Sequence, residues 1–356
     1  MKLTRCWVLI LILLAFGCKK KEISYEGGDF QTLMGAKKSV WKFVETPEDF
    51  QNMLKFETLY QEALTLQVAE DAEEKIPKVI HFIWLGPSPF PSESIENINS
   101  WASHHPDFVI KFWTDRRRSL PHPKMKLQLV SDFSFSLLKR NYEETTNYAE
   151  KSDLLRYEIL SKEGGLYVDH DMQCFKSVRE FHDRYHLYCG VEPPHQPVLS
   201  SSVTVNNNII GASPQHPVLL KAMELVKARW DEIGAAYPEE DKESTIYRVA
   251  HRSWSSFHDA VMTDAGRGER RDVVFPAAYF NRIEGDFGLY AHHLYASTWF
   301  EDETKFEKNV RRKLVAITKK NNQILLLNGV ILAGNLLLFL GLFLQLRSLR
   351  KRSDVK

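Results

Sequence analysis

The sequence predicts an α/β fold with a mostly parallel central sheet. Three short apolar runs, at residues 78–85, 108–114 and 166–168, carry this prediction. They lack the polar alternation of half-exposed strands, and such runs are typical of strands buried on both faces of a parallel sheet. Segments with helical character lie between them, at residues 94–104 and 149–162. Strands that alternate with helices indicate parallel pairing.

The composition is that of an ordinary globular protein. The chain has 356 residues, of which 44% are hydrophobic and 26% charged, so it lacks the bias that marks a disordered or fibrous protein. A net charge of +1 gives no reason to expect a nucleic-acid partner. The spacing of the four cysteines indicates neither a disulfide framework nor a zinc site, although a single Cys174–Cys189 bridge stays open.

Residues 1–18 have the pattern of an export signal. Lys2 and Arg5 precede a short apolar stretch, and small residues come just before Cys18. The segment resembles a bacterial lipoprotein leader with Cys18 as the lipidated residue. A plain signal peptide or an uncleaved anchor stays open as an alternative.

A second segment, residues 324–346, predicts a transmembrane helix. It contains no charged residue, and as a helix it would be about 34 Å long, enough to cross a bilayer. The basic tail at residues 347–356 favours a cytosolic C-terminus, and therefore a catalytic domain on the non-cytosolic side of the membrane. The juxtamembrane segment at residues 303–323 is also basic, so local charge alone does not decide the topology.

Residues 19–75 are interpreted as a tether followed by an accessory helix. The tether, residues 19–45, has little pattern. Thr46 is a suitable N-cap residue and Pro47 suits the first helical position. Apolar residues at helical spacing then predict a helix that continues to about Glu73.

The stretch from Ala149 to Cys174 contains most of the candidate catalytic residues. Steps of three and four residues place Asp153 and Arg156 on one face of the predicted helix. Gly164 and Gly165 end that helix, because glycine can adopt the positive φ angles of a helix terminus. The chain then enters the strand at residues 166–168.

An acidic pair follows that strand directly. Side chains alternate along an extended chain, so Asp169 and Asp171 should point the same way and His170 the opposite way. Two carboxylates at the carboxyl end of a parallel strand suit a hard divalent cation such as Mn²⁺ or Mg²⁺. Ligands of open α/β sheets bind at that edge.

The whole block resembles the DXD-motif glycosyltransferase family. Its residues 152–171 read SDLLRYEILSKEGGLYVDHD, and HFIWLG at residues 81–86 and FWTD at residues 112–115 complete the pattern. The family includes fungal Golgi mannosyltransferases and mannosyl-inositol-phosphoceramide synthases, and is related to the glucosylating domains of large clostridial toxins. The resemblance covers about residues 76–300. It implies a GT-A nucleotide-sugar transferase fold, with a catalytic domain at residues 76–302.

The resemblance also implies roles for the central residues. Asp171 would ligate the metal, and Asp169 would contact the ribose or a metal-bound water. Asp153 and Arg156 would hold the hydroxyls and the diphosphate of the donor. As an ordinary exposed ion pair, Asp153 and Arg156 would stabilise the helix by only about 0.3 kcal/mol.

Further residues are implicated around that centre. Trp84 would stack on the base, Tyr167 would lie near the donor, and Asn207 or Asn208 would hydrogen-bond the sugar or the acceptor. The last family block would close over the diphosphate and metal with Ser297, Trp299 and one histidine. The spacing does not decide whether that histidine is His292 or His293.

The predicted function is metal-dependent transfer of a hexose, with retention of configuration, from a UDP- or GDP-sugar to a glycan, lipid or protein. One alternative is a catalytically inactive, membrane-anchored binding protein. Another is a phosphatase that places Asp-x-Asp after a strand, but it would require Thr or Val where this chain has Gln173. A glycosidase with paired carboxylates would not need a metal.

Overall fold

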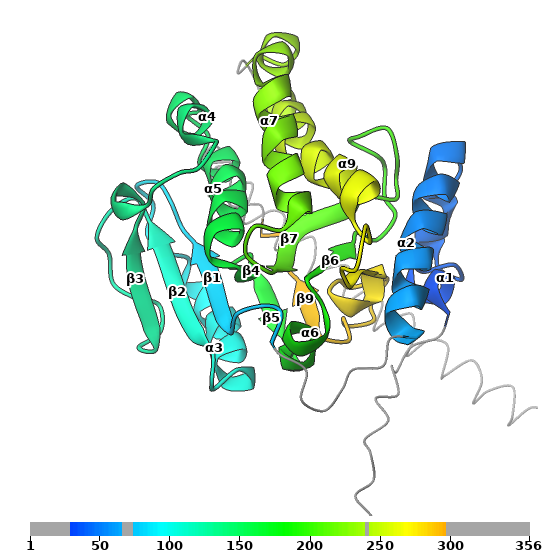
Figure 1. Cartoon of the computed structure of the whole chain (residues 1–356), viewed down its shortest axis with the longest axis horizontal. Helices are drawn as coiled ribbons and strands as arrows, with labels where there is room; N and C mark the ends of the chain where they lie inside the picture. The colour runs from blue at the N-terminus through cyan, green and yellow to red at the C-terminus, as the bar shows by residue number, and fades with distance from the viewer. Residues whose placement is uncertain (1–28, 66–73, 239–241, 297–356) are drawn as a thin grey trace, which may run out of the picture. The chain divides into compact units, whose positions relative to one another are not determined.

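The computed structural model describes residues 29–65, 74–238 and 242–296. A seven-stranded sheet forms the centre of this unit, in the order β3-β2-β1-β4-β7-β6-β8 (Figure 1). Its strands are β1 Val79–Ile83, β2 Val109–Thr114, β3 Met125–Leu129, β4 Gly165–Val168, β6 Leu187–Val191, β7 Val205–Ala212 and β8 Asp272–Phe275. A separate two-stranded antiparallel sheet pairs β5 Met172–Cys174 with β9 Ala291–His293.

The central sheet is mostly parallel, as the sequence predicts. Every strand except β7 runs in the same direction, and β7 is antiparallel to both of its neighbours. The apolar runs at residues 78–85, 108–114 and 166–168 form β1, β2 and β4. Their side chains are largely buried, which explains the absence of polar alternation.

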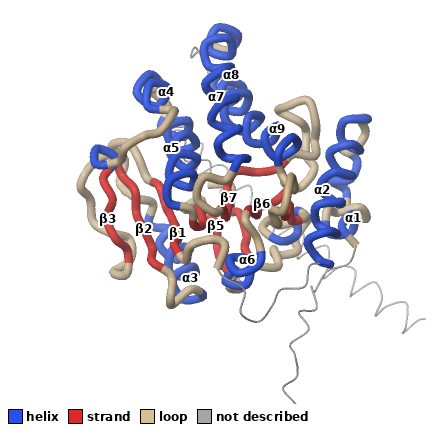
Figure 2. Tube along the Cα trace, in the orientation of Figure 1, coloured by secondary structure: helices blue, strands red, loops and turns tan. Residues whose placement is uncertain are grey.

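Helices and short turns surround the sheet (Figure 2). The α-helices are α1 Phe30–Leu33, α2 Pro47–Thr65, α3 Ile95–His104, α4 Lys139–Glu144, α5 Tyr148–Glu163, α6 Arg179–Arg184, α7 Pro217–Ala236, α8 Lys242–Val249 and α9 Ser255–Asp264. The 3₁₀ turns are η1 Ser39–Phe43, η2 Ser92–Ser94, η3 Val130–Asp132 and η5 Ala277–Tyr279, and η4 Ala250–Trp254 is a π-helical turn.

The topology creates a binding edge between β1 and β4. From β1 the chain passes through α3 to β2 on one side, whereas from β3 it returns through α5 to β4 on the other. Because such crossovers are right-handed, the two helices cover opposite faces of the sheet, as Figure 1 shows. The carboxyl ends of β1 and β4 therefore form a topological switch point, which is where open α/β sheets bind ligands.

The C-terminal part of the predicted tether belongs to the fold, which corrects the interpretation of residues 29–45. Phe30 and Met34 are completely buried and Leu33 nearly so, because α1 packs beside α2. The helix predicted from Thr46 begins as expected, since the Thr46 hydroxyl accepts a hydrogen bond from the Asp49 amide. It is described as far as Thr65, and residues 66–73 lie outside the described residues.

Several predictions concern segments outside the described residues: the leader at residues 1–18, the basic segment at 303–323, the apolar segment at 324–346 and the tail at 347–356. Within the part of the chain that is described, no helix is long and apolar enough to cross a membrane. Cys174 and Cys189 are both buried and free, so the bridge that the sequence left open is not formed.

Candidate active site

A glycine pair connects helix α5 to strand β4. Gly164 and Gly165 have φ angles of 65° and 99°, which glycine adopts without strain. A β-carbon at Gly165 would lie 2.7 Å from the Val79 carbonyl oxygen. The buried ring of His81 accepts a hydrogen bond from the Trp113 indole at 3.1 Å, so its Nε2–H donates to the Gly164 carbonyl at 2.9 Å. This turn fixes where β4, and the acidic residues after it, leave the sheet.

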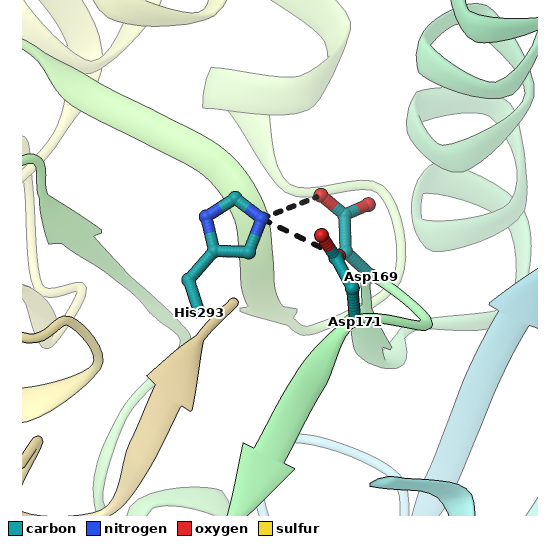
Figure 3. A group of neighbouring side chains, drawn as sticks. All are labelled: Asp169, Asp171 and His293. Carbon is teal, nitrogen blue, oxygen red and sulfur yellow. Dashed lines mark ion pairs between the residues drawn. The ribbon is translucent and has the colours of Figure 1, made fainter. Parts of the chain in front are cut away.

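Two carboxylates and one imidazole converge at the end of β4 (Figure 3). The His293 Nε2 atom lies 3.3 Å from Asp171 Oδ1 and 4.0 Å from Asp169 Oδ2. One ligand atom from each of the three residues lies within 4.8 Å of the others. The aspartates come from the turn between β4 and β5, and His293 comes from β9.

His170 points away from this group, as predicted, although residues 169–171 form a turn and not an extended strand. Its Nδ1 atom lies 2.8 Å from the Ser94 hydroxyl, and its ring meets Trp84 edge to face, with centroids 4.9 Å apart. Burial lowers the pKa of His170, which favours a neutral ring. Trp84 is partly exposed, and its indole donates to the Ser88 carbonyl. Trp84 thus lies beyond the end of β1, one strand from the carboxylates.

The structure brings His293, and not His292, to the carboxylates. The two residues are neighbours on β9, so their side chains leave opposite faces of the β5–β9 ribbon. The ring of His292 lies among aromatic side chains. Its centroid is 5.6 Å from that of the Phe287 ring and 6.4 Å from that of the Phe175 ring. His292 is therefore not placed to share a metal with Asp171.

Arg156 links the helix to the acidic pair. Its guanidinium lies 2.8 Å from Asp153 Oδ1 and 3.4 Å from Asp169 Oδ1, and it stacks over the Tyr167 ring at 4.1 Å. The Tyr167 hydroxyl donates to Asp169 at 2.5 Å. The Arg156 side chain is only 6% exposed. Asp153 and Arg156 are therefore not an ordinary solvent-exposed ion pair on a helix.

Asp153 is saturated by protein donors. Besides Arg156, it accepts hydrogen bonds from the Ser253 hydroxyl and, at 3.1 Å, from the Trp254 indole. Burial raises the pKa of Asp153, and the charge of Arg156 opposes that shift. Ser253 and Trp254 were not identified from the sequence, because they lie far along the chain on the π-helical turn η4 and belong to no local motif.

The antiparallel strand β7 delivers two asparagines to the same edge. Asn207 donates from its side chain to the Tyr157 hydroxyl at 3.0 Å, and its carbonyl accepts from Arg156 at 2.6 Å. The Asn208 amide nitrogen lies 3.1 Å from His293 Nδ1. Its Oδ1 atom is buried without a partner among the described residues. Rotating this amide by 180° would let Oδ1 accept from Nδ1–H and leave Nε2 of His293 unprotonated toward the carboxylates.

The donor set fits a divalent cation. Two carboxylates and one imidazole nitrogen are suitable ligands for Mn²⁺, and carboxylates with water suit Mg²⁺. A second group beside the imidazole, here Asn208, is typical of histidines that bind metal. Burial alone would lower the pKa of His293, but the charges of Asp171 and Asp169 raise it above its ordinary value. The site therefore attracts positive charge.

Two of the predicted donor-binding residues, Ser297 and Trp299, lie outside the described residues. The other predicted residues, Asp153, Arg156, Tyr167, Asn207 and Trp84, all lie around the carboxyl ends of β1 and β4.

The sequence of this region matches a known family. Residues 91–188 match the family described as "Glycosyltransferase sugar-binding region containing DXD motif". The matched region contains the helix α5, the glycine pair and Asp169–Asp171. This part of the chain is therefore similar to the DXD-motif glycosyltransferases.

Individual proteins are similar to parts of this chain. Inositol phosphoceramide mannosyltransferase 3 of Schizosaccharomyces pombe is 26% identical over 172 residues, 48% of this chain and 42% of that protein. Subversion of eukaryotic traffic protein A of Legionella pneumophila is 30% identical over 117 residues, 29% of this chain and 18% of that protein. The chain thus spans less than half the length of either relative. Among solved structures, the PaToxG glycosyltransferase is 21% identical, with a TM-score of 0.42 over 60% of this chain and 76% of its own.

Proposed function

We propose that this protein is a metal-dependent glycosyltransferase with a GT-A fold, which moves a hexose from a nucleotide sugar to an acceptor. The observation that carries the proposal is the convergence of Asp169, Asp171 and His293 at the switch point between β1 and β4. The match of residues 91–188 to the DXD-motif glycosyltransferase family supports the reaction class. The alternative of an inactive binding protein is disfavoured, because none of the acidic residues Asp153, Asp169 and Asp171 is missing.

The three converging residues would hold Mn²⁺ or Mg²⁺. A cation there would neutralise part of the charge of a bound diphosphate. Arg156 would contribute a second positive charge to the leaving diphosphate as the sugar–phosphate bond breaks. Tyr167 would keep Asp169 and Arg156 in place, through its hydroxyl and its ring respectively. Trp84, partly exposed beyond β1, would supply the surface on which the base stacks.

The proposal includes retention of anomeric configuration, which is expected from the family resemblance. No side chain of the described site stands out as an enzymatic nucleophile, because the carboxylates near the sugar position are committed to Arg156 and to the metal group. A front-face route therefore fits better than a double displacement. Proton NMR of the first product anomer would test this feature.

Screening the full chain against UDP- and GDP-hexoses tests the function itself. We expect slow hydrolysis of one donor without any acceptor, and faster turnover with glycan, lipid or protein acceptors for that donor. The names of the relatives make mannose and an inositol phosphoceramide acceptor the first pair to try. A phosphatase would instead release phosphate from simple phosphomonoesters and leave nucleotide sugars intact.

We further propose that the chain is membrane-attached, with residues 324–346 as a single span and the catalytic domain on the non-cytosolic side. The export pattern at residues 1–18 and the basic tail support this orientation. A reporter that works only after export, fused at Lys356, should be inactive, while a reporter that fluoresces only in the cytosol should be bright. The reverse result would invert the orientation.

A further inference from the structure

Asp153 depends on a π-helical turn that neither the sequence motif nor the family region contains. The turn η4, Ala250–Trp254, contributes two consecutive side chains to one carboxylate oxygen, Asp153 Oδ2. π-Helical turns are rare and frequently occur at functional sites. Ser253 is fully buried, Asp153 is 4% exposed and Trp254 is partly exposed. Trp254 is therefore the member of the group that solvent reaches.

The turn is part of a closed ring of hydrogen bonds around Arg156. The Asn207 amide donates to the Tyr157 hydroxyl at 3.0 Å, and that hydroxyl donates to the Ser253 carbonyl at 3.1 Å. The Ser253 hydroxyl contacts Asp153, Asp153 pairs with Arg156, and Arg156 donates to the Asn207 carbonyl. The ring joins α5, β7 and η4, so it fixes the guanidinium from three elements at once.

We propose that Ser253 and Trp254 are positioning residues for the transfer reaction: they hold Asp153, and through it Arg156, in the orientation that faces the DXD carboxylates. The inference rests on the proposed function. Arg156 binds Oδ1 of Asp153, and the donors on Oδ2 fix the orientation of that carboxylate. The guanidinium is therefore held in place only while both oxygens accept hydrogen bonds. If the indole N–H is lost, Asp153 keeps Arg156, Asn207 and the Ser253 hydroxyl as donors, and that hydroxyl also lies 2.9 Å from the Val249 carbonyl. The carboxylate is then held by fewer donors, and its orientation toward Arg156 is less well fixed.

Loss of the hydrogen bond from Trp254 to Asp153 should lower turnover more than it weakens donor binding. Negative charge on the diphosphate is greater after the sugar has left than before, so a misplaced Arg156 weakens the transition state and the nucleoside diphosphate product more than the bound donor. A purely structural role would instead lower thermal stability and leave the kinetic constants of the folded protein unchanged.

The test compares two Trp→Phe substitutions that each remove an indole-to-carboxylate hydrogen bond and keep an aromatic ring. Trp254→Phe removes the bond to Asp153. Trp230→Phe removes the 2.9 Å bond to Glu144 on α4, outside the site. Turnover of the accepted nucleotide sugar, its KM, Tm and the calorimetric Kd of the nucleoside diphosphate with Mn²⁺ are measured for the full chain.

Trp254→Phe should lower kcat about 10-fold with less than a two-fold change in donor KM, and weaken nucleoside diphosphate binding several-fold. Trp230→Phe should leave all three constants at the unmodified level. Ser253→Ala should resemble Trp254→Phe, and the double variant should lose less than the product of the two single effects, because both act through Asp153. Unchanged kcat and Kd in folded Trp254→Phe would overturn the inference and leave the proposed function standing. A complete lack of turnover by the unmodified chain would overturn both.

Discussion

Nε2 of His293 lies 3.3 Å from Oδ1 of Asp171, although the two residues are far apart in the sequence. The contact exists because β5, which follows the DXD turn, pairs with β9, which ends in His293. The register places His293 opposite Met172, one residue after Asp171. A short two-stranded ribbon therefore completes the acidic site with an imidazole.

Substitution of either DXD carboxylate should abolish transfer. Asp171→Ala and Asp169→Ala are each expected to lower kcat about 100-fold or more, because the charge that holds the cation is lost. Asp107→Ala, which removes a half-exposed carboxylate in a surface ion pair, is the control and should retain full activity. Circular dichroism checks the fold. Normal turnover by folded Asp171→Ala would show that the site lies elsewhere.

The two adjacent histidines offer a matched pair. His293→Ala should weaken Mn²⁺ binding about 10- to 100-fold and lower turnover in proportion at limiting metal. His292→Ala should leave metal affinity unchanged, since its ring lies among Phe175 and Phe287. Calorimetric titration of Mn²⁺ into each full-length variant measures its metal affinity and shows which of the two histidines binds the ion. Equal losses, or a loss confined to His292→Ala, would contradict the assignment.

Trp84 should affect donor binding in particular. Loss of a base-stacking surface in Trp84→Ala is expected to weaken donor affinity by about 1–3 kcal/mol, by analogy with stacking on nucleic-acid bases. Trp84→Phe should recover most of that affinity because it retains a ring. If Trp84 only packs against His170 and Phe90, Trp84→Ala would lower Tm and leave the KM of the donor unchanged.

Buried histidines should make the fold sensitive to acid. Burial lowers the pKa of His81, His105 and His182 to about 4 in the folded state, from an ordinary value of about 6.5. The unfolded chain therefore binds these protons first as the pH falls. Stability should be constant with respect to these groups above pH 6.5 and decline between pH 6.5 and 4, by about 3 kcal/mol for each group.

Urea unfolding at a series of pH values measures this decline. His182→Gln removes one of the three groups and should make the loss of stability between pH 6.5 and 4 smaller. His293 contributes with the opposite sign, since its pKa is raised and its stabilisation is lost as the pH rises above 6.5. A free energy of unfolding that does not change between pH 6.5 and 4 would contradict the neutral, buried state of these rings.

Local patterns predicted the part of the site that is contiguous in sequence. The run from Asp153 to Asp171 specifies a helix, a glycine turn and a strand. The two carboxylates follow in a turn, and they meet on one side of it with His170 on the other. The apolar runs likewise predicted β1, β2 and β4, because strands buried on both faces need no polar alternation.

Other parts depend on long-range packing that no local pattern contains. The choice between His293 and His292 follows from the register of β9 on β5. The roles of Ser253 and Trp254 follow from where η4 meets α5. The burial of Phe30 in a segment expected to be a tether reflects a hydrophobic surface supplied by the rest of the fold. Each of these features needs a partner that is distant in sequence.

Dependence of donor turnover on a divalent cation tests the central claim most directly. The full chain is incubated with its accepted nucleotide sugar, first after exhaustive treatment with EDTA and then with Mn²⁺ or Mg²⁺ added back. Because the ligand set is two carboxylates and one imidazole, we expect turnover to vanish with the chelator and to return with either ion. Full turnover in exhaustive chelator would contradict a metal-bridged diphosphate at Asp169, Asp171 and His293.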